Sequence, residues 1–129
     1  MSQIKIYALT RTIEQHRNQL SSAIHAALVS ALQYPPSKKF QRFIALNEQD
    51  FIYPDDRSHS YLIIEISMFE GRSIDAKKML IRQLFANIQT QCDISPQDIE
   101  ITIFETPKHN WGIRGQCGDE LALNYKVEV

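Results

Sequence analysis

The chain has 129 residues, a length typical of one domain, and 43% of them are hydrophobic, which is enough for a single core. A net charge of −1 gives no reason to expect nucleic acid or an acidic membrane as a partner. No apolar run approaches the roughly 20 residues that span a bilayer, and the first residues have no signal-peptide layout. Two cysteines, Cys92 and Cys117, are too few for a disulfide framework, so we expect reduced thiols in a cytoplasmic protein.

The first half of the chain predicts a strand, a helix and a second strand. Apolar residues alternate with others at positions 4, 6 and 8, which indicates a half-buried strand. Thr12 is placed to cap the helix that follows. Pro35-Pro36 ends this helix, because proline lacks an amide hydrogen, and a strand is predicted from about Phe40 to Leu46. The expected buried face of the helix comprises Leu20, Ile24, Ala27, Leu28 and Ala31.

The second half predicts the same order of elements. Tyr61 to Met68 is rich in β-branched and aromatic residues and predicts a central strand. Gly71 permits a tight turn, and Ser73 caps a helix from about Ile74 to Gln91. Ser95-Pro96 predicts a short helical turn before a strand with isoleucine at positions 99, 101 and 103. Residues 121–129 also alternate and predict a further strand. The expected buried face of the helix comprises Met79, Leu80, Leu84, Phe85 and Ile88.

One numbering offset relates the two halves. Arg11-Thr12-Ile13-Glu14 recurs as Arg72-Ser73-Ile74-Asp75, which is 61 positions later (72 − 11). A single shift that aligns a turn, a helix face, a proline and a strand indicates an internal duplication. We therefore predict one domain, 1–129, with repeat one at about 1–55, repeat two at about 60–115 and a carboxyl-terminal strand at 121–129. The same offset carries Leu20 onto Ile81, Ile24 onto Phe85, Pro35 onto Pro96, and Phe43 onto Phe104.

The predicted fold class is α+β. Within each repeat the crossover makes the two strands parallel, and such crossovers are right-handed. Two repeats side by side predict a four-stranded mixed sheet with both helices on one face. The strand residues Ile4, Ile6, Ile63, Ile64 and Ile66 cannot all point at the helices, so the other face is expected to be apolar. An exposed apolar face of this size predicts association with further copies of the chain.

Four stretches of the second repeat carry a resemblance to a known family. They are Glu70-Gly71-Arg72-Ser73, Lys78-Met79-Leu80-Ile81-Arg82, Ile99 to Glu105, and Asn110-Trp111-Gly112-Ile113-Arg114-Gly115. Together they resemble the 4-oxalocrotonate tautomerase family. The duplicated chain is similar to the branch of that superfamily that contains malonate semialdehyde decarboxylase and the cis-3-chloroacrylic acid dehalogenases. The resemblance implies a duplicated β-α-β unit that assembles as a homotrimer.

The chemistry implied by this resemblance depends on an amino-terminal proline. In that superfamily its secondary amine sits in an apolar pocket, which lowers the pKa of the amine, and it acts as general base or acid. Positions 1 and 2 here are Met1 and Ser2, so the proline is missing and reduced or altered chemistry is expected. Two further positions depart from the pattern. Lys38 lies where the decarboxylase-like enzymes carry an aspartate, and Glu100 where the small tautomerases carry a second arginine.

The predicted catalytic residues are Met1, Ser2 and Arg72. An α-amine at the start of the chain remains a weak base near neutral pH. Arg72 begins a helix, where free backbone amides attract anions; the alternative is a surface arginine paired with Glu70 or Asp75. In the superfamily, arginines hold the substrate carboxylate, which a guanidinium contacts through two hydrogen bonds. The predicted substrate-binding residues are Arg11, Arg57, Ser73, Trp111 and Arg114.

The substrate-binding candidates also have structural alternatives. Arg57 sits in a sequence typical of a solvated loop, and Trp111 is equally suited to packing in a core. Arg114 either reaches a neighbouring subunit's site or stays in solvent. No cofactor and no metal site is expected, because the histidines His16, His25, His59 and His109 do not lie at metal-ligand spacing.

Three functions remain open on the sequence. The first is an enzyme, tautomerase-like or decarboxylase-like, that acts on a small 2-oxo or unsaturated carboxylic acid. The second is a non-catalytic trimer that binds a small carboxylate or serves as an interaction module. The third is a ferredoxin-like βαββαβ ligand-binding domain unrelated to tautomerases. Parallel neighbouring strands within each half distinguish the first two from the third.

Overall fold

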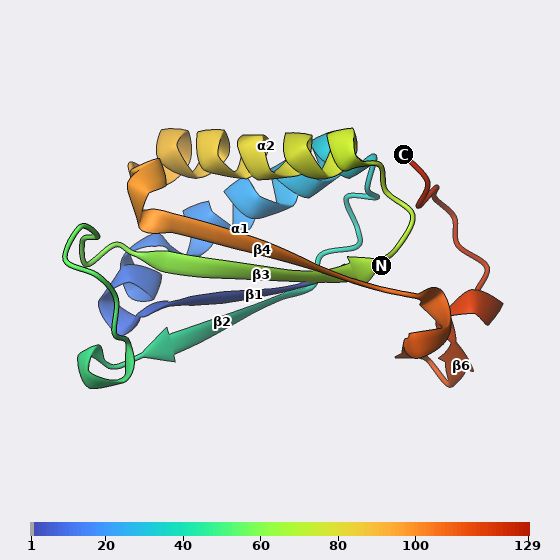
Figure 1. Ribbon diagram of the computed structural model, residues 1–129, viewed down its shortest axis with the longest axis horizontal. Coiled ribbons are helices and arrows are strands. Elements are labelled where there is room, and N and C mark those ends of the chain that lie inside the picture. Colours follow the sequence, from blue (N-terminus) through green and yellow to red (C-terminus); the bar gives the residue numbers. More distant parts are fainter. Residues whose placement is uncertain (1) are drawn as a thin grey trace.

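Two helices cover one face of a four-stranded sheet in the computed structural model, which describes residues 2–129 (Figure 1). Repeat one supplies β1 (Ser2–Leu9), α1 (Thr10–Leu32) and β2 (Gln41–Leu46). Repeat two supplies β3 (Leu62–Phe69), α2 (Ile74–Cys92) and β4 (Ile99–Thr106). Four 3-10 turns complete it with a small hairpin: η1 (Glu48–Asp50), η2 (Pro96–Asp98), η3 (Lys108–Asn110), β5 (Gly112–Ile113), β6 (Gln116–Cys117) and η4 (Gly118–Glu120).

The sheet has the strand order β2-β1-β3-β4. The pairs β1–β2 and β3–β4 are parallel, whereas the central pair β1–β3 is antiparallel. Each repeat is therefore a β-α-β unit, and the two units lie side by side in opposite directions. This pairing confirms the predicted mixed sheet and rules out the ferredoxin-like alternative.

The prediction of a second apolar face is wrong. Four of the five isoleucines lie on the helix side: Ile4, Ile6, Ile64 and Ile66 are each at most 2% exposed, and the register pairs Ile4 with Ile66 and Ile6 with Ile64. The far side carries charge at its centre, where Lys5 lies opposite Glu65 and their side chains form a 3.8 Å ion pair. A strand exposes alternate residues on opposite faces, so this register puts all four isoleucines on one side.

The helices differ in how they begin. Ser73 caps α2 as predicted, since its hydroxyl accepts a 3.1 Å hydrogen bond from the Ala76 amide. Thr12 does not cap α1, which begins two residues earlier without a side-chain cap; its hydroxyl donates to the His59 carbonyl at 2.9 Å. The predicted buried face of α2 is confirmed at Leu80, Leu84 and Ile88 but is wrong at Met79, which is 53% exposed. Of the described helices, neither is long and apolar enough to cross a membrane.

The carboxyl-terminal strand predicted over 121–129 is not present. Nothing in this segment pairs as a strand in the structure; it runs from the hairpin back toward the start of α2 (Figure 1). Its apolar residues, Leu123, Tyr125 and Val127, pack beside Phe69 instead. Alternation arises here because one side of an extended segment is buried, without a neighbouring strand to pair with. We call residues 121–129 the tail.

Candidate functional site

The candidate site lies where β1 begins and β3 ends. The antiparallel register places Ser2 opposite Met68, so the first described residue is adjacent to the turn that carries Gly71 and Arg72. Gly71 adopts φ 131°, a conformation that side-chain-bearing residues rarely adopt, and Val127 packs within 3.1 Å of where its Cβ would be. The turn consequently brings the next side chain, that of Arg72, back toward the sheet.

Arg72 is a buried cation, only 4% exposed. Its Nη1 donates to the Phe69 carbonyl at 3.3 Å, whereas Nε and Nη2 find no hydrogen-bond partner among residues 2–129. Burial lowers the pKa of Arg72, and the nearby oxygens of Tyr125 and Tyr34 act in the opposite direction. A guanidinium stays charged at neutral pH even so. The N–H groups of Nε and Nη2 point in the same direction, so together they can donate hydrogen bonds to both oxygens of one carboxylate.

Two tyrosines that the sequence analysis did not single out complete this cluster. Tyr34 is 2% exposed, and its hydroxyl accepts a 2.9 Å hydrogen bond from the Ser2 amide. Its ring meets that of Tyr125 edge to face, with 5.3 Å between the centroids. Burial, followed by the proximity of Tyr34, raises the pKa of Tyr125 to about 12. We call Ser2, Tyr34, Arg72 and Tyr125 the amino-end cluster.

Ser2 contributes a further unsatisfied group to the amino-end cluster. The residue is 1% exposed, and its hydroxyl has no hydrogen-bond partner among the described residues. Buried polar atoms are nearly always paired with protein or with ordered water. Three unpaired atoms at one place, on Ser2 and Arg72, therefore mark a position where ordered water or a polar ligand can bind. The other predicted residue at this end of the chain, Met1, lies outside the described residues.

The remaining candidates of repeat two surround the cluster without entering it. Ser73 is occupied as the cap of α2. Trp111 packs edge to face on Phe69 at 5.2 Å, and so supports the strand end whose carbonyl holds Arg72. Arg114 and Gly115 form the tip of the β5–β6 hairpin with φ values of 50° and 82°, as in a type I′ turn. Arg114 is exposed there.

The other two predicted arginines lie at the opposite end of the sheet. Arg11 is exposed and forms a 3.1 Å ion pair with Glu48, beside a surface groove of about 310 Å³. Arg57 forms an ion pair with Asp56 and lies 5.7 Å from the centre of the Tyr61 ring. Within one chain, therefore, the structure does not bring these two arginines together with Arg72.

Glu100 and Lys38, which depart from the family pattern, also lie at different ends. Glu100 accepts a 3.0 Å hydrogen bond from the Tyr61 hydroxyl and is 3.9 Å from Arg57. Lys38 belongs to the turn before β2, where its amide donates to the Pro35 carbonyl at 3.0 Å. Of these two departures, only Lys38 is at the end of the sheet that holds the amino-end cluster.

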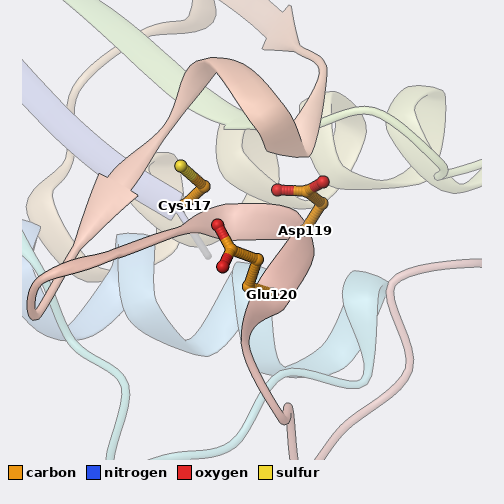
Figure 2. A group of neighbouring side chains, drawn as sticks. All are labelled: Cys117, Asp119 and Glu120. Carbon is orange, nitrogen blue, oxygen red and sulfur yellow. The ribbon is translucent and has the colours of Figure 1, made fainter.

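One group of described side chains has its potential ligand atoms close enough together, within 4.8 Å of one another, to bind a metal ion. Cys117, Asp119 and Glu120 follow the hairpin and point toward a common space (Figure 2). All three are exposed, and exposed acidic groups of this kind are common without a bound ion. A hydrogen bond and repulsion from Glu120 raise the pKa of the Cys117 thiol, which disfavours the thiolate that metals require. The group is separate from the amino-end cluster.

Comparison with known proteins identifies the family. A family model described as a tautomerase enzyme matches residues 38–114, more than half of the chain. The 2-hydroxymuconate tautomerase of Comamonas testosteroni is 33% identical over 57 residues, which are 44% of this chain and 90% of that relative. Less than half of this chain thus matches nearly the whole of that relative, as expected if this chain contains two copies of the same unit.

Solved structures extend the similarity to the whole fold. The chain superposes on FG41 malonate semialdehyde decarboxylase, inhibited by 3-bromopropiolate, with a TM-score of 0.81 and 26% identity, covering 94% of this chain and 98% of that one. The F6 fused 4-OT, an asymmetric trimer, gives a TM-score of 0.79 with 22% identity, covering 91% and 96%. By its family-model match and its fold, this chain belongs to the tautomerase superfamily.

Proposed function

We propose that this protein binds a small 2-oxo or unsaturated carboxylic acid at the amino-end cluster, with Arg72 holding the carboxylate. The observation that carries the proposal is the unpaired Nε and Nη2 of a 4% exposed guanidinium. A buried charge that lacks partners is strongly destabilising, whereas a carboxylate bound to both atoms supplies charge and hydrogen bonds together. An inhibited relative whose inhibitor, 3-bromopropiolate, is a small carboxylate supports the same ligand class.

The internal repeat provides a comparison within the same molecule. Arg11 is the counterpart of Arg72, but it is already paired with the carboxylate of Glu48 at 3.1 Å. The offset of 61 residues places His109 at the position equivalent to Glu48, so repeat two has no carboxylate there. This difference supports Arg72, rather than Arg11, as the arginine that takes an external carboxylate.

We propose reduced or altered chemistry at this site relative to a proline-based tautomerase. Residue 2 is a serine whose nitrogen donates to Tyr34 as a backbone amide. An amide nitrogen has no basic lone pair, so it cannot accept a proton while Met1 is attached. With Met1 attached, the alternative function applies, a non-catalytic module that binds a small carboxylate. The enzymatic alternative requires a free amine at the terminus, which would then lie beside the Tyr34 hydroxyl.

We also propose that the protein is a homotrimer. The F6 fused 4-OT, which has the same fold, is described as a trimer. The described surface of a single chain exposes several large apolar side chains on different faces, which neighbouring copies could cover: Phe40, Ile52, Ile74, Met79 and Phe104.

Steady-state kinetics test the proposed chemistry. With phenylpyruvate as substrate, we expect weak or absent tautomerase activity in the wild type. A Ser2→Pro variant whose methionine is removed should gain about 10²-fold or more in kcat/KM, because general acid-base catalysis typically contributes 10²–10⁴-fold. Adding Arg72→Ala should abolish the gain, while adding Arg11→Ala, the matched control, should preserve it. Wild-type turnover at the level of proline-based tautomerases would refute the proposal of reduced chemistry, and no gain from proline would favour the binding module.

A further inference from the structure

The four-stranded sheet has an open strand at each of its two sides. β2 pairs only with β1 and β4 only with β3, so the outer backbone groups of both strands have no partner strand among residues 2–129 (Figure 1). The edge of an unpaired strand is a template for pairing with another chain. We call residues 38–46, which include β2, the β2 margin, and residues 99–106, which form β4, the β4 margin.

The two margins have opposite charges. The β2 margin contains no acidic residue and three basic ones: Lys38, Lys39 and Arg42. The β4 margin contains no basic residue and two acidic ones: Glu100 and Glu105. Within the described part of the chain, none of the three cations forms an ion pair. Each glutamate has a cation nearby, but only its Oε1 makes that contact, so the second oxygen of each carboxylate is available to another partner.

Both margins also expose a phenylalanine, and the two lie at the same level of the sheet. One row of the strand register crosses all four strands, from Gln41 in β2 to Ile103 in β4. Phe40 and Phe104 adjoin the two ends of this row on the side of the amino-end cluster, and they are 42% and 50% exposed. Packing these two rings against each other removes apolar surface from water at both margins.

We propose that the β2 margin of one copy pairs with the β4 margin of the next copy, with Phe40 against Phe104 and Lys39 against Glu105, each one residue further along. The two strands run in opposite directions, so this contact is an antiparallel pair. A trimer of equivalent copies requires such a head-to-tail contact between two different surfaces, because a surface that binds itself forms only pairs. The inference rests on the proposed homotrimer, and it assigns the surfaces that join the copies. Contact of the β2 margin with itself brings together basic residues without an acidic partner.

Substitutions at either margin test the contact by its effect on mass. Phe40→Asp and Phe104→Asp should each lower the mass seen by light scattering from that of three chains toward the 14.9 kDa of one chain. Ile52→Asp is the matched control, because Ile52 is 92% exposed but lies in the loop between β2 and β3, so it should keep the wild-type mass. Circular dichroism verifies that each variant is folded.

Carbodiimide cross-linking of the wild type tests the pairing without any substitution. The reagent joins an ammonium and a carboxylate that are in contact through an amide bond. Lys77 and Glu105, which form a 2.7 Å ion pair within one chain, are the positive control. Mass spectrometry of the digested protein should also find Lys39 linked to Glu105. Three strand spacings of about 4.8 Å separate these two residues within one chain, so this link joins two copies.

The outcomes separate this inference from the proposals on which it rests. A wild-type mass of one chain contradicts the homotrimer and the inference together. A wild-type mass of three chains that both folded aspartate variants retain overturns the inference alone, and so does a Lys77–Glu105 link without a Lys39–Glu105 link. The cross-link decides the question even where a variant does not fold. Binding of a carboxylate at Arg72 is tested independently, because neither phenylalanine belongs to the amino-end cluster.

Discussion

At the scale of single residues, the candidate site consists of polar groups whose pKa values are shifted by burial. Arg72 remains charged although its surroundings lower its pKa, and Tyr125 remains neutral because the same surroundings raise its pKa to about 12. Burial penalises the charged form of each group, and it therefore moves the two pKa values in opposite directions. Each group also partly offsets the effect of burial on the other, because Tyr125 raises the pKa of Arg72 and Arg72 lowers the pKa of Tyr125.

Tyr125 gives a pH-dependent prediction. Its pKa in the folded protein, about 12, exceeds the ordinary value of 10.0, so the unfolded chain ionises first as the pH rises. The stabilising contribution of Tyr125 is then complete below pH 10 and is lost as the pH approaches 12. Urea unfolding from pH 9 to 11.5 should show a steeper loss of stability in the wild type than in Tyr125→Phe. Tyr53→Phe, at the other end of the sheet, serves as the control.

An absorbance titration of the phenolate provides the complementary reading. The component that titrates near pH 12 should disappear in Tyr125→Phe and persist in Tyr53→Phe. Equal pH slopes for the wild type and Tyr125→Phe, together with an unchanged titration curve, would show that Tyr125 is not held in the buried environment described here.

At the scale of elements, the tail has no regular secondary structure, and it contributes Tyr125 to the amino-end cluster. Val127 is 1% exposed and packs on Phe69, and the Val129 carbonyl accepts a hydrogen bond from the Ser73 amide at 3.4 Å. Lys108 and Glu128 add an ion pair at 3.8 Å with one exposed partner, and such pairs contribute little. The tail is therefore held mainly by its apolar contacts, and these place Tyr125 over Arg72.

Deletion of residues 121–129 tests both the tail and the proposed assembly. Light scattering of the wild type should give about 45 kDa, three times the 14.9 kDa of one chain. The deletion uncovers Phe69 and Arg72, so it should lower the melting temperature by several degrees. A tail that also packs on a neighbouring copy adds a second effect, a weaker assembly. A wild-type mass of one chain at micromolar concentration would contradict the trimer. An unchanged mass and melting temperature after deletion would contradict the role of the tail.

At the scale of the whole molecule, the sequence predicts the fold well because the fold is built from local patterns used twice. The duplication, the two helices and the parallel pairs within each repeat all follow from periodicity and from proline, glycine and serine at element ends. The faces of the sheet were harder to predict. Leu62, Ile63 and Ile64 form a continuous apolar run, which contains no alternation, and only the register with β1 shows which of them faces the helices.

The candidate site could be anticipated only in part, for a physical reason. Arg72 could be identified because it sits within a local motif at a helix start. Tyr34 and Tyr125 could not, because the cluster is assembled from positions 2, 34, 72 and 125, and no local pattern reports contacts over such distances. Pro35-Pro36 was the available signal for Tyr34: a chain that leaves α1 there must return to the start of β2, which is the same end of the sheet as Ser2. Nothing comparable marks Tyr125.

The proposed function requires that the buried guanidinium of Arg72 bind an external carboxylate, and the repeat supplies the control. The most direct measurement is calorimetric titration of pyruvate into the wild type, Arg72→Gln and Arg11→Gln, with circular dichroism to verify folding. Arg72→Gln should lose at least tenfold in affinity, because a charge-assisted pair typically contributes about 1.5–3 kcal/mol. Arg11→Gln should bind as the wild type does, since Glu48 already occupies Arg11. Equal binding by wild type and folded Arg72→Gln, or loss of binding in Arg11→Gln alone, would contradict the assignment.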